Sequence, residues 1–134
     1  MVGPEGRTPG GILRYGEAVA TRPDAVIGLD PGGARRAVDR GALLLDVRED
    51  DEWSEGHAPG AVHLPMGQLA GRLGEVPMGL TVVCVCRVGG RSMAVASELA
   101  GAGYDVRNLD GGMLAWERAG LPVVNSGAGP GRII

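Results

Sequence analysis

Short apolar runs and amphipathic segments alternate along the middle of the chain. The runs ALLLDV (residues 42–47) and LTVVCV (residues 80–85) have the length of strands and are almost purely apolar, which is typical of strands buried on both faces of a parallel sheet. Residues 91–102 instead carry apolar side chains at helical spacing. Repeated alternation of this kind predicts an α/β domain with a mostly parallel central sheet, flanked by helices on both faces.

Capping and turn residues punctuate this pattern. Asp30 followed by Pro31 predicts the N-cap and the first residue of a helix, which is expected to end at Gly41. The other expected elements are a helical turn within 48–57, a short strand at 61–65, a short helix at 66–73, a strand at 105–109 and a final helix at 111–120.

The 134 residues fit one domain with a single core. Residues 26–124 carry the alternating pattern and are predicted to be that domain. Because residues 1–11 and 125–134 are rich in Gly and Pro, we expect a flexible N-terminal extension over 1–25 and a flexible Gly-rich C-terminal tail. A short helix over 12–21 is an open alternative for part of the extension.

Composition narrows the classes of function. Hydrophobic residues make up 44% of the chain and aromatic residues only 3%, so aliphatic side chains must build the core. The formal net charge is −3 without a basic run, which disfavours a nucleic-acid partner. No apolar segment approaches the roughly 18–20 residues of a membrane span, and no signal peptide is found, so we expect a soluble cytoplasmic protein without a membrane partner. No metal-ligand spacing or nucleotide loop is found, and neither a metal nor a cofactor is expected.

Candidate chemistry lies in the stretch CRVGGRS, where Cys86 follows a predicted strand and precedes a predicted helix. In open α/β sheets, ligands bind beyond the carboxyl ends of the strands. Gly89 and Gly90 allow positive φ and a close approach of the backbone to a ligand. Inward-pointing N–H groups and the helix N-terminus would then form an anion cradle around the sulfur.

Such a cradle would activate Cys86 as a nucleophile without a histidine base. At the ordinary cysteine pKa near 8.5, only about 3% of the thiol is thiolate at pH 7. Helix N-termini and neighbouring arginines lower that pKa, and Arg87, Arg91 and the loop N–H groups are sufficient causes here. A shift of two units, about 2.7 kcal/mol, would make the thiolate the main form. Cys84 lies within the apolar run and is expected in the core, and a strained disulfide between the two cysteines is not expected.

Four motifs occur in order along the chain, namely LLLDVRE, GHAPGAVHLP, CRVGGRS, and LDGGMLAW with the GLPV that follows it. In this order and spacing they resemble the single-domain rhodanese family over residues 26–124. The resemblance implies a rhodanese-like fold and an enzyme of the thiosulfate sulfurtransferase type. Cys86 would attack a sulfane-sulfur donor such as thiosulfate, hold the sulfur as a persulfide, and pass it to cyanide, a thiol or an acceptor protein.

The same resemblance suggests roles for other residues. The persulfide would be bound by N–H groups of the loop after Cys86, which consists of Arg87, Val88, Gly89, Gly90 and Arg91. The two arginines of that loop would attract an anionic donor. Supporting roles, expected to be the holding of loops rather than chemistry, would fall to Asp46, Arg48 and His57. Structural roles are expected for Trp53, His63 and Trp116, although the segment of Trp116 could border the site.

Three alternatives remain open at this stage. A persulfide relay would use the same Cys86 but deliver the sulfur to a partner protein. A non-catalytic rhodanese-like interaction module usually lacks the loop cysteine, which is present here. Related phosphatases use a cysteine loop one residue longer, and one residue adds up to about 3.5 Å of chain. The four residues between Cys86 and Arg91 therefore disfavour a phosphatase or an arsenate reductase.

Overall fold

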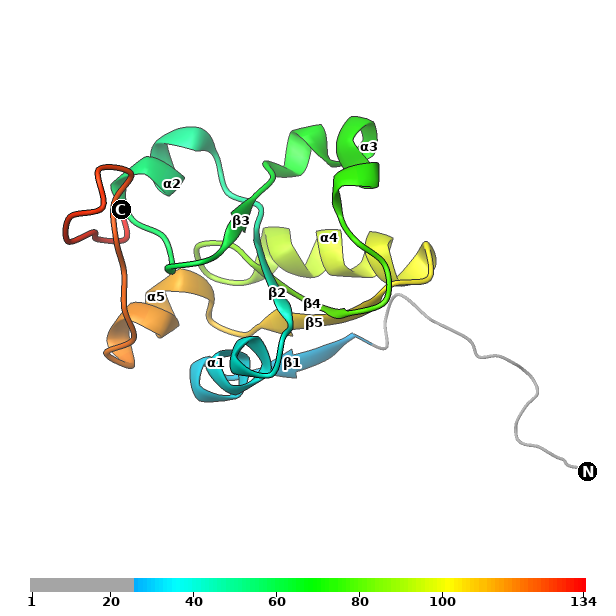
Figure 1. The fold of residues 1–134 in the computed structure, drawn as a ribbon, viewed down its shortest axis with the longest axis horizontal. Coiled ribbons are helices and arrows are strands. Elements are labelled where there is room, and N and C mark those ends of the chain that lie inside the picture. Colours follow the sequence, from blue (N-terminus) through cyan, green and yellow to red (C-terminus); the bar gives the residue numbers. More distant parts are fainter. Residues whose placement is uncertain (1–25) are drawn as a thin grey trace, which may run out of the picture.

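The computed structural model describes residues 26–134, so the extension and the alternative short helix expected within 1–25 lie outside the described residues. A five-stranded sheet forms its centre, with the strand order β1-β5-β4-β2-β3 and every pair parallel (Figure 1). The strands are β1 (Ile27–Leu29), β2 (Leu43–Asp46), β3 (Val62–His63), β4 (Thr81–Val85) and β5 (Asp105–Leu109). The apolar run at residues 80–85 forms β4, which lies in the middle of this order.

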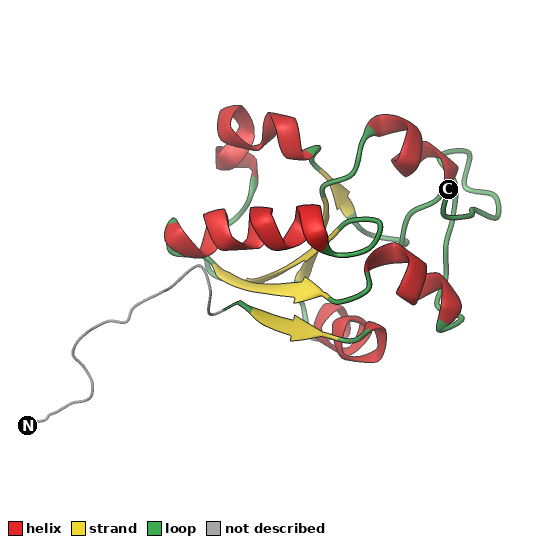
Figure 2. Ribbon diagram, turned by 180° about the vertical axis from the view of Figure 1, so that it is seen from behind, coloured by secondary structure: helices red, strands yellow, loops and turns green. Residues whose placement is uncertain are grey.

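Helices cover both faces of the sheet (Figure 2). They are α1 (Pro31–Asp39), α2 (Asp50–Glu55), α3 (Leu69–Arg72), α4 (Gly90–Gly101) and α5 (Gly112–Arg118), with short 3₁₀ turns on either side of α3. The predicted fold class, a parallel α/β sheet between two helical layers, is confirmed. Within residues 26–134, no helix combines the length and the apolar character that crossing a membrane requires.

Side chains of β4 alternate between the two helical layers. Cys84 belongs to a buried cluster with Val95 of α4, whereas Val83 belongs to a second cluster with Ala34 of α1 and Met113 of α5. Because both faces of the strand are buried, its sequence reads as a continuous apolar run rather than as an alternating one. Cys84 therefore lies in the core, as expected.

Helix α1 begins where the capping residues predict. The Asp30 carboxylate accepts a hydrogen bond from the Gly33 N–H at 2.7 Å, and Pro31 occupies the first helical position, where its missing N–H costs nothing. The chain turns after the helix at Gly41, which has a φ of +104°. Strand β1, which precedes the helix, is only three residues long and was not singled out by the apolar pattern.

The segment after α5 folds back onto the domain, and it includes residues 125–134, for which the sequence predicts a flexible tail. His57 and Val124 exchange two backbone hydrogen bonds, at 2.8 and 2.9 Å, and the Arg132 N–H donates to the Glu55 carbonyl at 3.0 Å. The side chain of Ile133 packs against the buried cluster on the α1 face. This close approach depends on Gly56, because a Cβ there would lie 2.2 Å from the Arg132 carbonyl oxygen.

Candidate active site

The Cys86 loop connects the carboxyl end of β4 to the first turn of α4. Gly89 is the N-cap of α4 and has a φ of +115°, a conformation that favours glycine. Gly90 is already helical, so only the first of the two glycines uses the conformational freedom that the sequence suggested for both. The structure thus places Cys86 at the edge of the sheet where ligands bind in open α/β folds.

Donors of the loop and of the first turn of α4 contact the sulfur of Cys86. The Gly89 N–H lies 3.1 Å from Sγ and the Ser92 hydroxyl lies 3.3 Å from it. Burial raises the pKa of Cys86, but hydrogen bonds from the Ser92 hydroxyl and from the N–H groups of Ser92, Gly89 and Val88 outweigh it and hold the pKa below its ordinary value. The lowering expected from the sequence is present, and its main causes are hydrogen bonds, which include those of the loop N–H groups; Arg91 adds a coulombic interaction with Cys86.

The Ser92 hydroxyl is shared among three acceptors. Besides Cys86 Sγ, it lies 3.2 Å from the Gly89 carbonyl oxygen and 2.6 Å from Oδ1 of Asn108 on β5. A hydroxyl has a single hydrogen to donate, so the contact with the sulfur competes with the shorter one to Asn108. Ser92 and Asn108 are both buried, so this network is shielded from solvent and holds the loop against β5.

The outer side of the loop is anchored by the start of α5. The Met113 N–H donates to the Cys86 carbonyl at 2.8 Å, and the Leu114 N–H donates to the Arg87 carbonyl at 3.1 Å. Gly112 permits this contact, since a Cβ on it would lie 2.4 Å from the Arg87 carbonyl oxygen. With these carbonyl groups bonded to α5, N–H groups of the loop are left to face the sulfur.

Access to the sulfur is narrow. Cys86 is only 1% exposed, whereas Val88, at the outer surface of the loop, is 56% exposed. A donor must therefore be small or flexible enough to reach Sγ, or the loop must open. Cys84 is chemically different, because burial raises the pKa of its thiol to about 12.

The two loop arginines are already paired. Arg91 forms a bidentate ion pair with Glu52 of α2, at 2.8 and 2.9 Å, and this hydrogen bonding lowers the pKa of Glu52 to about 2. Nε of Arg87 donates to the backbone carbonyl of Ile134 at 2.9 Å. Among the described residues, neither guanidinium has a hydrogen bond to Cys86, so the free cations expected from the sequence are instead tied to other parts of the fold.

Asp46 and Arg48 form a buried ion pair next to the site rather than within it. Nη2 of Arg48 lies 2.7 Å from the Asp46 carboxylate and also 2.7 Å from the Gly56 carbonyl oxygen. Arg48 thereby holds the end of β2 to the end of α2. Since α2 carries Glu52, the pair lies where it can position the partner of Arg91, and the loop-holding role expected for both residues stays a prediction.

The two histidines also have structural contacts. Trp53 stacks on both imidazoles, with ring centroids 3.6 Å from His57 and 4.7 Å from His63. Nδ1 of His57 lies 2.8 Å from the Trp53 carbonyl oxygen, and Nε2 of His63 lies 2.8 Å from the Arg48 carbonyl oxygen. Trp116 is buried in the core and donates to the Pro122 carbonyl at 2.8 Å. Its helix, α5, borders the Cys86 loop through backbone hydrogen bonds.

Three residues of the site were missed in the sequence. Ser92 follows the loop arginine directly, and a hydroxyl in the first turn of a helix after a cysteine loop could have marked it. Asn108 is a polar residue in an otherwise strand-like segment, which is a weak signal. Glu52 lies 39 residues before Arg91, and nothing in the local pattern links the two.

Comparisons with known proteins agree with this architecture. A family model for the rhodanese-like domain matches residues 30–119. A protein named sulfurtransferase from Allochromatium vinosum is 43% identical over 83 residues, which cover 61% of this chain and 78% of that protein. The thiosulfate sulfurtransferase GlpE of Pseudomonas syringae is 34% identical over 89 residues, covering 66% of this chain and 84% of the relative.

A similar fold occurs within a larger solved structure. The crystal structure of reduced Bacillus anthracis CoADR-RHD matches with a TM-score of 0.66 and 34% identity. The match covers 68% of this chain but only 16% of that chain, so the shared unit is a small part of the larger protein. Together with the family model, which spans more than half of the sequence, the parallel sheet and the cysteine loop place the chain in the rhodanese-like domain family.

Proposed function

We propose that this protein is a sulfurtransferase that carries a sulfane sulfur on Cys86 as a persulfide. The observation that carries the proposal is the pair of donors on Sγ, the Gly89 N–H at 3.1 Å and the Ser92 hydroxyl at 3.3 Å. Hydrogen bonds to an anionic sulfur favour the thiolate, which is the nucleophilic form. The sulfurtransferase names of the Allochromatium and Pseudomonas relatives support the same reaction class.

The proposed first half-reaction uses thiosulfate. The Cys86 thiolate attacks the outer sulfur of thiosulfate, forming an S–S bond to the enzyme while the S–S bond of the donor breaks. Sulfite leaves with the electron pair of the broken bond, and the enzyme keeps one negative charge on the terminal sulfur. That sulfur lies one S–S bond, about 2 Å, from Sγ. It remains within reach of the loop N–H groups that bind the thiolate.

The second half-reaction returns the enzyme to its starting state. A nucleophile such as cyanide or a thiolate attacks the terminal sulfur, and the electron pair of the enzyme S–S bond returns to Cys86. With cyanide, the product is thiocyanate. Two half-reactions that share one covalent intermediate predict ping-pong kinetics. No proton transfer by a histidine is needed in either step.

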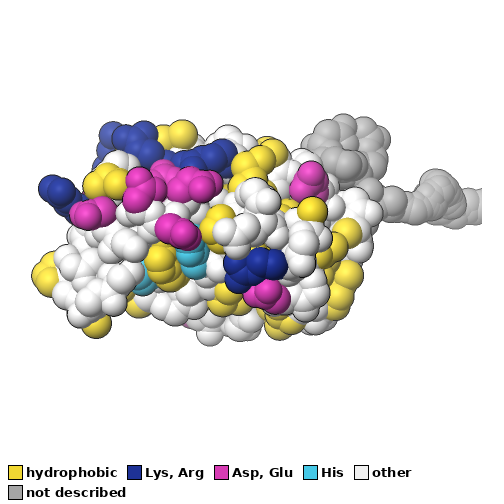
Figure 3. Space-filling model, turned by 90° about the horizontal axis from the view of Figure 1, so that it is seen from above, with side chains coloured by type: hydrophobic (Ala, Val, Ile, Leu, Met, Phe, Trp, Pro, Cys, Tyr) yellow, Lys and Arg dark blue, Asp and Glu magenta, His cyan; other side chains and the backbone are white. Residues whose placement is uncertain are grey.

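The charges around the loop suggest weak binding of an anionic donor. Arg91 is neutralised by Glu52, and Asp50 and Asp51 precede that glutamate on α2. Figure 3 shows acidic side chains gathered on the face that α2 occupies. We therefore expect thiosulfate to react with a high KM, and a donor of lower charge, such as an alkyl persulfide, to react with a lower one.

A partner protein is the second candidate for the acceptor that takes the sulfur from Cys86. Val88 is 56% exposed beside Cys86, although the cysteine itself is 1% exposed. An exposed apolar side chain at the rim of a reactive loop fits contact with another protein surface. In such a relay, turnover with cyanide would be slow while transfer to the partner would be fast. A cytoplasmic location stays a prediction from the sequence.

Steady-state turnover tests the proposed function. The protein is supplied with thiosulfate and cyanide, and thiocyanate is measured while each substrate is varied. Parallel double-reciprocal plots and complete loss of activity in Cys86→Ser, with activity retained in Cys84→Ser, are expected. Intersecting plots, or thiocyanate formation by Cys86→Ser, would exclude a Cys86 persulfide as the intermediate.

A further inference from the structure

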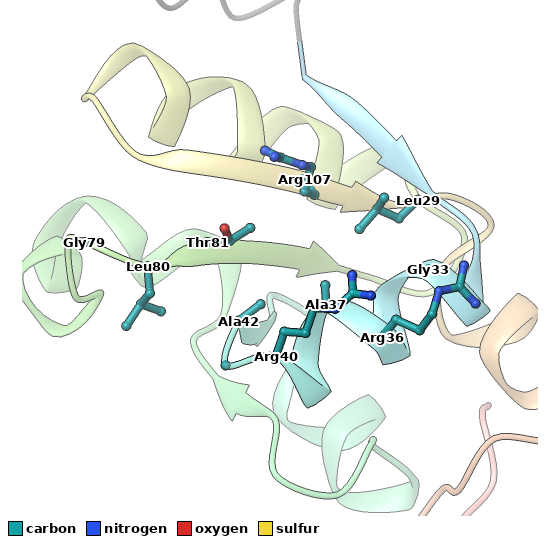
Figure 4. A pocket seen from close by; sticks show the side chains of 11 residues that line it. Leu29, Gly33, Arg36, Ala37, Arg40, Ala42, Gly79, Leu80, Thr81 and Arg107 are labelled. Atoms are coloured by element: carbon teal, nitrogen blue, oxygen red, sulfur yellow. The ribbon is translucent and has the colours of Figure 1, made fainter.

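A pocket lies at the opposite end of β4 from Cys86. It has a volume of about 580 Å³ and lies between α1 and the central strands (Figure 4). Helix α1 contributes Arg36, the C-cap residue that follows it is Arg40, and β5 contributes Arg107. β4 begins at this pocket with Thr81 and ends just before Cys86, so the strand separates the pocket from the reactive loop.

Arg36 and Arg40 have no counter-charge among the described residues. Among residues 26–134, neither Arg36 nor Arg40 forms an ion pair or a side-chain hydrogen bond, whereas the adjacent Arg35 pairs with Asp39 at 3.4 Å. The spacing of Arg36 and Arg40 brings like charges onto neighbouring turns of the helix, which is unfavourable in the absence of an anion. The C-terminal end of a helix tolerates cations, but this does not account for a third arginine on the sheet.

That third arginine occupies an unusual place. Arg107 is in register with Val83 on the sheet face that packs against α1, and the buried cluster on that face is apolar. Its Nη1 donates to Asp105 at 2.7 Å, and the other carboxylate oxygen of Asp105 accepts from the Thr81 hydroxyl at 2.6 Å. Within the described part of the chain, Nε and Nη2 of Arg107 have no hydrogen-bond acceptor. Three arginines against one aspartate leave a net excess of two positive charges.

The remaining walls are apolar and open. Leu29, Ala37, Ala42 and Leu80 line the pocket between the arginines. Gly79 also lines it and has no other atom within 4 Å of where a Cβ would lie, so the rim is not filled by side chains. A few charged groups around an apolar surface, in a space of this size, are typical of sites for small molecules.

We propose that this pocket binds a small organic phosphate. Arginine guanidinium groups pair with phosphate oxygens in a two-pronged geometry. Arg36, Arg40 and Arg107 bind the phosphate, and the apolar wall at Leu29 and Leu80 contacts the organic part. The pocket shares no residue with the Cys86 loop, so this proposal does not rest on sulfur transfer at Cys86.

Titration of the full chain, followed through backbone amide resonances, tests this proposal. The probes are pyrophosphate and adenosine diphosphate at constant ionic strength, with uncharged adenosine as the control. Shifts are expected at Ala37, Gly41 and Thr81, with saturation by adenosine diphosphate in the range of about 1 mM or tighter. The double variant Arg36→Gln/Arg40→Gln should bind about tenfold or more weakly.

The matched control is Arg35→Gln, which removes a charge from the same helix but from outside the pocket. It should bind both probes as the wild type does. Equal weakening in this variant would reduce the effect to general surface charge and overturn the proposal. Shifts confined to Gly89 and Ser92 would place the anion at the Cys86 loop, and the absence of any shift would show that the pocket binds no phosphate; either result overturns the proposal.

Discussion

Removing the Ser92 hydroxyl tests how Cys86 becomes a thiolate. Ser92→Ala deletes a donor 3.3 Å from Sγ and leaves the Gly89 N–H in place at 3.1 Å. A hydrogen bond to a charged group contributes about 1.5–3 kcal/mol, and one pKa unit corresponds to about 1.36 kcal/mol. Because the hydroxyl is shared with Asn108, the lower end applies. The pKa of Cys86 should therefore rise by about one unit.

The pH dependence of alkylation by iodoacetamide measures this change, since only the thiolate reacts. In a Cys84→Ser background, Ser92→Ala should move the midpoint upward and slow alkylation about tenfold at a pH below both midpoints. Ser54→Ala, which changes an exposed serine of α2, should leave the midpoint unchanged. An unchanged midpoint in a Ser92→Ala protein that retains its circular dichroism spectrum would refute the role of this hydroxyl.

Three further substitutions test other contacts. Glu52→Gln removes a carboxylate whose pKa is lowered from 4.5 to about 2 by its arginine partner, so its stabilisation is present above pH 4.5 and is lost as the pH falls through about 2. The variant should lose about 2 kcal/mol of unfolding free energy at neutral pH. Because Arg91 would no longer be neutralised, the KM for thiosulfate should be several-fold lower. An unchanged KM would contradict the claim that Glu52 neutralises Arg91. Gly112→Ala should lower the free energy of unfolding by about 2 kcal/mol or more, because a Cβ would lie 2.4 Å from a loop carbonyl oxygen. Gly120→Ala has a similar positive φ but lies in open space, so it should lower the free energy of unfolding by only about 1 kcal/mol in denaturant unfolding. Equal losses in the two variants would contradict the clash. Asp46→Ala leaves Arg48 buried without its partner, so the free energy of unfolding should fall by about 3–5 kcal/mol in the same measurement. A loss below about 1 kcal/mol, as expected for an exposed ion pair, would contradict this prediction.

The order of strands and helices could be predicted because each carries a local signal. β4 is a continuous apolar run, and α1 begins with an aspartate and a proline in capping positions. The three residues of β1 lack such a signal, since two of them are exposed at the sheet edge. Glycines in 125–134 suggested flexibility, but this segment lies against the end of α2, where Gly56 leaves room for the Arg132 carbonyl oxygen, a contact between segments far apart in sequence.

The candidate site was predicted only in part for a similar reason. The place of Cys86 between a strand and a helix follows from neighbouring residues, and the structure has it there. The partners of the loop residues do not follow from neighbouring residues, because Asn108 contacts Ser92 from another strand and Glu52 contacts Arg91 from another helix. Charge alone suggested that Arg91 would attract a substrate, whereas tertiary contacts had already paired it.

The most direct test of the central claim is the intact mass of the protein after incubation with thiosulfate. The wild type and Cys84→Ser should each gain the mass of one sulfur atom, Cys86→Ser should gain none, and cyanide should remove the added sulfur as thiocyanate. An adduct that persists in Cys86→Ser, or no adduct with thiosulfate and with an alkyl persulfide while Cys86 still reacts with iodoacetamide, would contradict the proposal that Cys86 carries the sulfur.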